Sequence, residues 1–283
     1  MQQKNTKEVL EKARREGYAV GAFNPHNLET IKAILLASEE LRAPVIIQIG
    51  QKMINRYGME ESVNVIKAIG KSIDATVSIH LDHGNSIEQA ESAIHSGFQS
   101  VMYDGSHLSI EENVKNTKKV IEIAKAHGIP VEGEIGQIPG VEDEVHVSED
   151  EASITTLEEA IEFVNLTNID FFAFSIGTAH GVYTKEPYIH FDRLREIAGV
   201  VSHPLVLHGG SGISDEMIRK SISLGIAKIN VDTDLRLKFK ESITKSITEN
   251  SYGHLTDLLD QAVYDVKEKV KEKIILFGSE NQV

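Results

Sequence analysis

The sequence predicts an α/β protein with a single (β/α)8 TIM barrel and extra terminal helices, spanning residues 1–283. Two observations predict this fold. Eight short apolar runs alternate with longer segments whose apolar residues recur every three or four positions. Eight strand–helix units in 283 residues also match the roughly 250 residues typical of such a barrel. A doubly wound parallel sheet remains the alternative, because periodicity alone does not separate a closed barrel from an open sheet.

The eight strand candidates are rich in Val and Ile, and several are apolar on both faces, as in a buried parallel sheet. In chain order they are Ala19–Phe23, Pro44–Ile49, Thr76–Leu81, Ser100–Tyr103, Ile129–Ile135, Asp170–Ile176, Pro204–Leu207 and Ala227–Val231. The helical segments are Asn27–Leu41, Ser86–Ser96, Ile110–His127, Thr156–Thr167, Phe191–Val200 and Ser214–Leu224. Ser109, Thr156 and Ser214 are expected helix caps, because an acidic residue follows each in the first turn.

Three segments fall outside these repeats. The charged start of the chain has a helical pattern without an apolar signal core. Residues 136–153 are acidic, contain Pro139 and Gly140, and predict a long mobile loop. Residues 255–277 predict an amphipathic helix or helix pair packed on the outside of the barrel.

Composition excludes several classes of protein. The net charge is −14, which argues against general nucleic-acid binding. The absence of cysteine excludes disulfides and thiolate metal sites, so a bound metal would need His, Asp or Glu. No apolar run is long enough to span a membrane. We therefore expect a soluble cytoplasmic protein.

Three histidines, His83, His180 and His208, each follow an apolar run and precede glycine. Three neutral imidazoles leave the fourth position open that a catalytic zinc requires. Each histidine alone could instead be a strand-end residue hydrogen-bonded to a loop. Their recurrence at equivalent strand ends favours the metal site. The role of His107, which also lies near the expected mouth, stays open.

Carboxylates lie near these histidines in sequence. Asp82 precedes His83, and both can reach one site only if the chain turns there, which Gly84 would permit. Asp82 is then a candidate for proton transfer or a partner of a ligand histidine. Glu132 and Glu134 share one face of their strand. Glu134 and Asp104 could form a second or alternative metal position, or belong to an interior hydrogen-bond network.

The last two barrel loops predict a phosphate site. Gly209-Gly210-Ser211-Gly212 precedes a helix, and the segment 230–233 follows the next strand. Backbone N–H groups at such turns and helix starts bind phosphate, and these loops are the recurrent phosphate site of TIM barrels. A simple tight turn is the alternative for the glycine-rich segment. Gly181 could add another N–H group.

These segments, taken together, resemble the class II, metal-dependent ketose-bisphosphate aldolases. The similarity extends in order through almost the whole chain, over residues 21–24, 81–84, 101–107, 131–136, 176–183, 205–213 and 228–232. The ordered set of motifs is far more specific than any one of them.

The resemblance implies reversible cleavage of fructose 1,6-bisphosphate to dihydroxyacetone phosphate and glyceraldehyde 3-phosphate through a zinc-stabilised enediolate. By position, it assigns the zinc to His83, His180 and His208, and proton exchange at the C4 hydroxyl to Asp82. Glu142 on the 136–153 loop would move the proton beside the carbonyl, although a solvated charge is the alternative. The substrate-binding residues implied are Asn24, Gly181, Gly209, Gly210, Ser211, Asn230, Val231, Asp232, Thr233 and Arg236.

The resemblance also implies a monovalent cation (Na⁺ or K⁺) beside the phosphate and a homodimer or homotetramer. Asp232 and Arg236 favour fructose bisphosphate and a role in glycolysis. Gly50 departs from the serine that many fructose-type members carry, so tagatose 1,6-bisphosphate or another ketose phosphate is the next candidate. A sugar-phosphate-binding barrel without turnover is a remote third reading.

Overall fold

The computed structural model describes residues 1–142, 145–148, 152–249 and 252–283, without the side chains of residues 141, 142, 145 and 146. Its main sheet is a closed barrel of eight parallel strands in the order β4-β3-β2-β11-β10-β9-β6-β5, closed by the pairing of β4 with β5. These strands are β2 (Val20–Phe23), β3 (Pro44–Ile49), β4 (Thr76–Gly84), β5 (Ser100–Tyr103), β6 (Val131–Ile135), β9 (Phe171–Phe174), β10 (Leu205–Leu207) and β11 (Ile226–Val231). The predicted TIM barrel is confirmed, and the open sheet is excluded.

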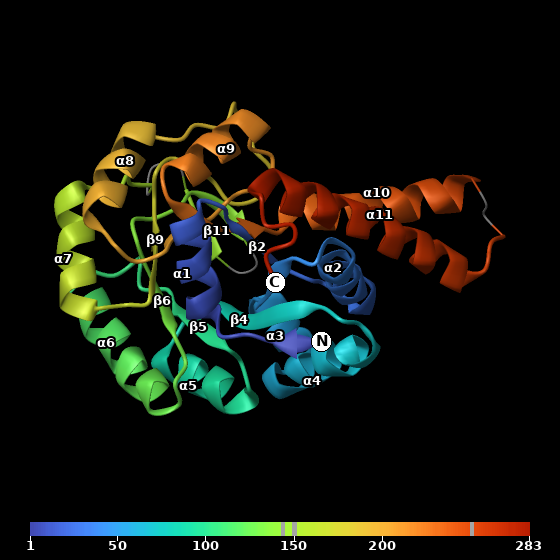
Figure 1. Cartoon of the computed structure of the whole chain (residues 1–283), viewed down its shortest axis with the longest axis horizontal. Coiled ribbons are helices and arrows are strands. Elements are labelled where there is room, and N and C mark those ends of the chain that lie inside the picture. Colours follow the sequence, from blue (N-terminus) through green and yellow to red (C-terminus); the bar gives the residue numbers. More distant parts are fainter. Residues whose placement is uncertain (143–144, 149–151, 250–251) are drawn as a thin grey trace.

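Helices surround the barrel (Figure 1). They are α2 (Leu28–Leu41), α3 (Gln51–Tyr57), α4 (Met59–Ile69), α5 (Ile87–Ser96), α6 (Ile110–Ala126), α7 (Leu157–Thr167), α8 (Phe191–Val200) and α9 (Asp215–Ser223). Ser109, Thr156 and Ser214 accept hydrogen bonds from backbone N–H groups of α6, α7 and α9, as predicted. Sequence reading had missed α3 and α4, which follow β3 in succession, and the short 3-10 turn Gly70–Ser72 after them.

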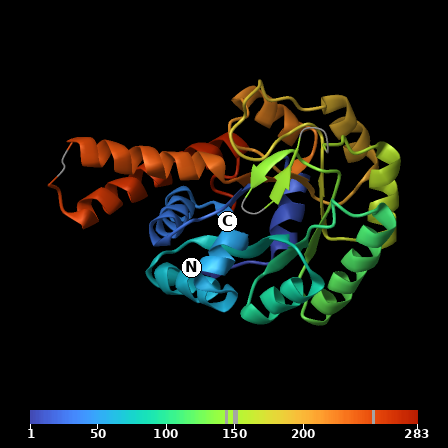
Figure 2. The same cartoon turned by 180° about the vertical axis from the view of Figure 1, so that it is seen from behind.

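The two ends of the barrel are covered differently. The N-terminal segment adds β1 (Gln2–Gln3) beside β4 and then α1 (Thr6–Glu16), which lies across one end. Leu10 and Ala13 of α1 pack on Val20, Ile46 and other buried apolar residues at this end of the barrel interior. Figure 2 shows the opposite end, which a small antiparallel hairpin of β7 (Gly140–Glu142) and β8 (Val145–Val147) overhangs. The segment expected as an irregular loop therefore contains a hairpin.

The last two helices form a long hairpin that extends away from the barrel (Figures 1 and 2). They are α10 (Thr233–Glu249) and α11 (Leu255–Phe277), and α11 also packs on α2. The helix expected over 255–277 is confirmed, whereas α10 had not been predicted. No helix within the described residues is long and apolar enough to cross a bilayer.

Strand β4 bends sharply at its C-terminal end. Its register against β5 shifts between Leu81 and Gly84, and His83 has a φ of 45°. The turn was expected from Gly84, but His83 itself takes the left-handed conformation, which is unusual for a residue with a side chain. Gly84 has another role: an added Cβ would lie 2.4 Å from the Met102 carbonyl oxygen of β5. The missing side chain therefore lets the two strands approach at the bend.

We expect Gly84→Ala to lower the free energy of unfolding by about 1–3 kcal/mol, because the added methyl group overlaps backbone. Gly199→Ala is the matched control, because a Cβ at this position in α8 meets nothing within 4 Å. That change should be neutral or stabilise by about 0.5–1 kcal/mol. Urea denaturation of the three proteins checks the prediction. Equal midpoints for wild type and Gly84→Ala would contradict the tight approach.

Candidate active site

The three predicted histidines meet at the C-terminal end of the barrel. His83 ends β4, His180 follows β9 and His208 follows β10. One ring nitrogen from each lies within 4.8 Å of the others, and all three side chains are buried. His83 Nε2 and His208 Nδ1 are 3.2 Å apart. Elements far apart in the sequence therefore converge on one point, as the recurrence of histidine at equivalent strand ends predicted.

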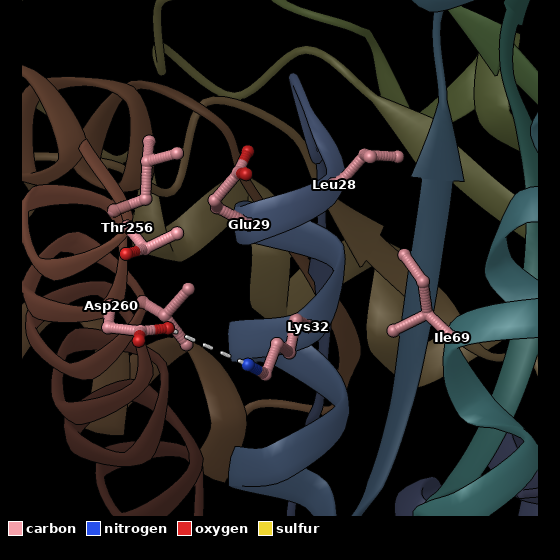
Figure 3. A pocket seen from close by; sticks show the side chains of 8 residues that line it. Leu28, Glu29, Lys32, Ile69, Thr256 and Asp260 are labelled. Carbon is pink, nitrogen blue, oxygen red and sulfur yellow. Dashed lines mark ion pairs between the residues drawn. The ribbon is translucent and has the colours of Figure 1, made fainter. Parts of the chain in front are cut away.

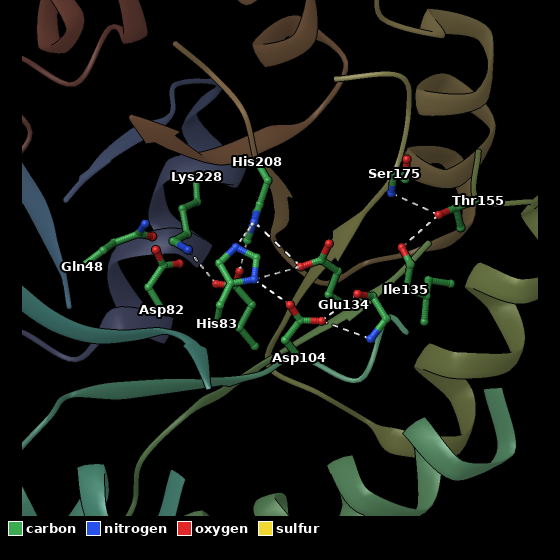
Figure 4. Close-up of polar contacts among 12 residues, drawn as sticks. Gln48, Asp82, His83, Asp104, Glu134, Ile135, Thr155, Ser175, His208 and Lys228 are labelled. Atoms are coloured by element: carbon green, nitrogen blue, oxygen red, sulfur yellow. Dashed lines mark hydrogen bonds and ion pairs between the residues drawn. The ribbon is translucent and has the colours of Figure 1, made fainter. Parts of the chain in front are cut away.

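Two of the three histidine rings have a carboxylate beside the nitrogen that points away from the cluster. His83 Nδ1 lies 2.6 Å from Asp104 Oδ2, and His208 Nε2 lies 2.9 Å from Glu132 Oε1. An ionised carboxylate only accepts hydrogen bonds, so each of these ring nitrogens carries the proton and donates it. When both rings are neutral, as metal binding requires, the proton-free nitrogens are His83 Nε2 and His208 Nδ1, which face each other. Figure 4 shows His83 and His208 side by side with Asp104 and Glu134 next to them.

The ionisation of these groups agrees with that assignment. Burial lowers the pKa of His208 to about 4, against the opposing hydrogen bond to Glu132, so the imidazole is neutral near pH 7. Burial alone would raise the pKa of Asp104, but its contacts with His83 and Ser106 together bring that pKa below the ordinary value. Burial would likewise raise the pKa of Glu132, but the Lys228 ammonium and the hydrogen bond from His208 together bring it below the ordinary value.

This donor set fits a divalent metal ion. His83 Nε2 and His208 Nδ1 lie 3.2 Å apart, so they can share one proton in a hydrogen bond or, when both are proton-free, bind the same cation. Nitrogen ligands in a set of three suit zinc. A second cluster, His83, Asp104 and Glu134, also has ligand atoms within 4.8 Å of one another. The alternative metal position predicted from Asp104 and Glu134 is therefore geometrically available.

Asp82 lies beside the histidine cluster and is 1% exposed. Asn24 Nδ2 donates to Asp82 Oδ2 at 2.7 Å, and Gln48 Nε2 donates to Asn24 Oδ1 at 3.0 Å. The bend at His83 places both side chains of the Asp82-His83 pair at one site. Asn24 was expected to bind substrate, but its amide is engaged with Asp82 and Gln48. In this geometry it orients the carboxylate.

A small pocket adjoins the histidines. Its lining residues are His180, Gly181, Gly209, Ser211, Asn230, Asp232 and Thr233. Neither side-chain amide atom of Asn230 finds a hydrogen-bond partner among the described residues, although the residue is 2% exposed. Helix α10 begins at Thr233, which lines this pocket. Buried unpaired polar atoms next to a helix N-terminus suit an anionic ligand.

Two residues of the predicted phosphate site do not line this pocket. Val231 is fully buried in β11. Gly210 donates its N–H to the Asn230 carbonyl oxygen at 3.0 Å, and an added Cβ would lie 2.5 Å from the Ile229 side chain. Neither residue is therefore among those that line the pocket.

Asp232, which does line the pocket, has two basic partners. Its Oδ1 lies 2.6 Å from His26 Nε2, and its Oδ2 lies 3.7 Å from Arg236 Nε. A carboxylate in an anion pocket would repel phosphate, and the Arg236 guanidinium offsets its charge. The sequence gives no signal for His26, because nothing in the local pattern relates it to a residue 206 positions later.

The remaining predicted residues lie apart from the cluster. His107 is exposed in the turn after β5. The backbone of Glu142 belongs to β7, but its side chain lies outside the described residues, so its predicted role is untested. Gly140 forms a β-bridge with His180, which brings β7 next to the third histidine. A cavity of about 490 Å³ lies here, lined in part by Gly140, His180, Lys185 and Tyr188.

Another cavity, of about 250 Å³, lies between α2 and α11 on the outside of the barrel. Leu28, Ile69 and Val263 line it, and Lys32 and Asp260 form an ion pair of 3.8 Å across it (Figure 3). None of the histidines or carboxylates of the cluster lines it. The chemistry therefore collects at the barrel mouth and not in this outer groove.

Comparisons with known proteins agree with this site. A family model described as fructose-bisphosphate aldolase class-II matches residues 4–282. A sulfofructosephosphate aldolase of Alkalicoccus urumqiensis is 48% identical over 277 residues, which cover 98% of this chain and 96% of that protein.

Solved structures agree as well. The YdjI aldolase of Escherichia coli K12 is similar with a TM-score of 0.86 and 35% identity, covering 99% of each chain. A putative fructose-1,6-biphosphate aldolase of Coccidioides immitis has a TM-score of 0.89 and 30% identity, covering 98% of this chain and 97% of that one. This protein, with its three histidines at the mouth of a TIM barrel, therefore belongs to the class II fructose-bisphosphate aldolase family and is a lyase of the aldolase type.

Proposed function

We propose that this enzyme reversibly cleaves a ketose phosphate to dihydroxyacetone phosphate and an aldehyde. The ketose phosphate would carry a second anionic group at the end of the sugar opposite to the first phosphate. The observation that carries the proposal is the convergence of three buried imidazoles beside an anion pocket. His83, His180 and His208 would hold a zinc ion. When bound, zinc supplies a Lewis acid that polarises the ketone and stabilises the negative charge that develops on carbon–carbon cleavage.

Asp82 is proposed to move the proton of the C4 hydroxyl. Breaking the C3–C4 bond turns C4 into an aldehyde, so the C4 hydroxyl must give up its proton to a nearby base. The buried carboxylate of Asp82, oriented by Asn24, is that base in our proposal. In the direction of condensation the same carboxyl group returns the proton.

Glu142 is proposed to protonate C3 after cleavage. The bridge between Gly140 and His180 supports this role, because it anchors the start of β7 beside the site. A carboxylate on a segment over the mouth can act where water has been excluded.

The Asn230 pocket is proposed to bind the phosphate of the dihydroxyacetone end. Gly181, Gly209 and Ser211 supply backbone or hydroxyl donors, and Ser211 Oγ already accepts a hydrogen bond from Asp234 N at 3.2 Å. That contact leaves the Ser211 hydroxyl proton for the ligand. A monovalent cation (Na⁺ or K⁺) would balance the remaining phosphate charge.

We propose a sulfofructose phosphate as the first candidate substrate. The relative that is 48% identical is named as a sulfofructosephosphate aldolase and aligns over nearly all of both chains. Fructose 1,6-bisphosphate, with a role in glycolysis, is the second candidate. The contact of Arg236 with Asp232 favours it, because this arginine at the pocket rim could reach a second phosphate. Tagatose 1,6-bisphosphate stays an alternative, since Gly50 offers no serine hydroxyl before α3.

We also propose that the protein forms a homodimer or homotetramer. The α10–α11 hairpin extends from the barrel and carries exposed apolar residues, with Leu255 66% and Ile247 49% exposed. Light scattering during size-exclusion chromatography distinguishes these states from a monomer.

Coupled assays with the three substrates test the proposed activity. We expect cleavage of the sulfofructose phosphate with a higher kcat/KM than for either bisphosphate. Chelation should abolish the activity, and added zinc should restore it. Activity that survives complete removal of zinc would contradict the metal site. A preference for fructose bisphosphate would move the enzyme to the second candidate without changing the mechanism.

Replacing Asp82 with Ala tests its role. We expect kcat to fall about 10²- to 10⁴-fold, the usual contribution of a positioned acid–base group. Zinc content should stay unchanged, because Asp82 is not in the set of three histidines. Asp82→Asn is the matched control for shape and should lose similar activity. Turnover close to wild type in either variant would remove Asp82 from the proposed mechanism.

Replacing Asp232 with Ala tests substrate choice. The change removes the partner of both His26 and Arg236, so we expect the relative kcat/KM for the three substrates to shift by about tenfold, which corresponds to roughly 1.4 kcal/mol. The preference for fructose bisphosphate should decline most. An unchanged ratio would show that Asp232 takes no part in specificity.

A further inference from the structure

A lysine is buried in the barrel interior below the histidines. Lys228 points inward from β11 and is fully buried. Its Nζ lies 2.7 Å from Glu132 Oε2 of β6, and both side chains have no exposed surface. Figure 4 shows Lys228 next to His208. An ion pair at this depth costs desolvation free energy, so it adds little to stability compared with apolar packing.

The partner carboxylate of Lys228 is also the one that holds His208. Glu132 Oε1 accepts from His208 Nε2 at 2.9 Å, while Oε2 faces Lys228 and lies 3.4 Å from His80 Nε2. His80 is fixed in turn by Ser100 Oγ, 2.8 Å from its Nδ1. Both oxygens of Glu132 thus have fixed partners, which determines the direction from which the carboxylate reaches His208.

We infer that Lys228 and Glu132 are positioning residues that orient the His208 ring and keep its Nδ1 free for the metal. The inference rests on the proposed zinc site. Without Glu132, His208 could rotate or carry its proton on Nδ1, and either change removes one ligand. Without Lys228, the carboxylate loses the contact that fixes its Oε2 and turns away from the ring.

Two other possible roles of Lys228 predict experimental results that differ from those of a positioning residue. A Schiff-base lysine would bond covalently to the ketone, but this ammonium is paired with Glu132 and fully buried below the histidines. Borohydride reduction in the presence of dihydroxyacetone phosphate should therefore leave Lys228 unmodified, and a reduced adduct on it would overturn the inference. A purely structural ion pair would affect stability and leave the metal affinity alone.

The test measures zinc affinity of metal-free protein by competition with a chelator. The variants are Lys228→Met, Glu132→Leu and the double variant. We expect each to bind zinc about 10- to 100-fold more weakly, the usual effect of removing the partner of a metal-bound histidine. The double variant is decisive. A single replacement leaves one uncompensated charge in the barrel interior and can unfold the protein, whereas the double replacement leaves none.

Lys273→Met is the matched control. Lys273 is also a buried lysine, 6% exposed, and pairs with one carboxylate, Asp234, at 2.6 Å. We expect this variant to keep the zinc affinity of wild type. A folded double variant with wild-type zinc affinity would overturn the inference and leave the pair a structural role. If wild-type protein itself fails to bind zinc, the proposed function fails instead, so the two failures are distinguishable.

Discussion

The structure depends on one constraint, the meeting of three buried imidazoles whose ring nitrogens converge on one point. His83 Nε2 and His208 Nδ1 lie 3.2 Å apart, and Asp104 and Glu132 accept hydrogen bonds from the other nitrogen of each ring. This arrangement is unfavourable in an empty apolar core and favourable around a cation. The unusual φ of His83 contributes to it, and strain of this kind is often found at functional sites.

The two ends of the barrel interior differ in polarity. At the end covered by α1 the buried residues are mainly apolar, and Thr6 of α1 makes hydrogen bonds with Ser78 and Ser100 there. At the mouth, the alternating inward positions of the strands carry polar residues such as Gln48, Glu134 and Asn230. The protein is acidic overall, with a net charge of −14, yet the proposed phosphate pocket needs only local donors and the basic partners of Asp232. The negative net charge of the whole protein is therefore compatible with a local site for an anionic ligand.

Much of this could be predicted from the sequence. The eight strands follow from apolar runs, and Pro44–Ile49 and Ser100–Tyr103 match the prediction at both ends. The histidines could be found because each lies at or shortly after the C-terminal end of an apolar run and precedes a glycine. The β7–β8 hairpin and α10 were missed, since a three-residue strand and a weakly amphipathic helix leave little periodic signal. The contacts of His26 and Lys228 depend on pairing across the closed barrel, which no local pattern encodes.

A crystal structure of the zinc-loaded enzyme, with anomalous scattering measured at the zinc edge, tests the central claim most directly. The account predicts one strong anomalous peak bonded to ring nitrogens of His83, His180 and His208, at about 2.0–2.1 Å from each. Nδ1 of His208 should be the coordinating atom, and Nε2 should still face Glu132. A peak elsewhere on the molecule, or coordination through His208 Nε2, would contradict the account.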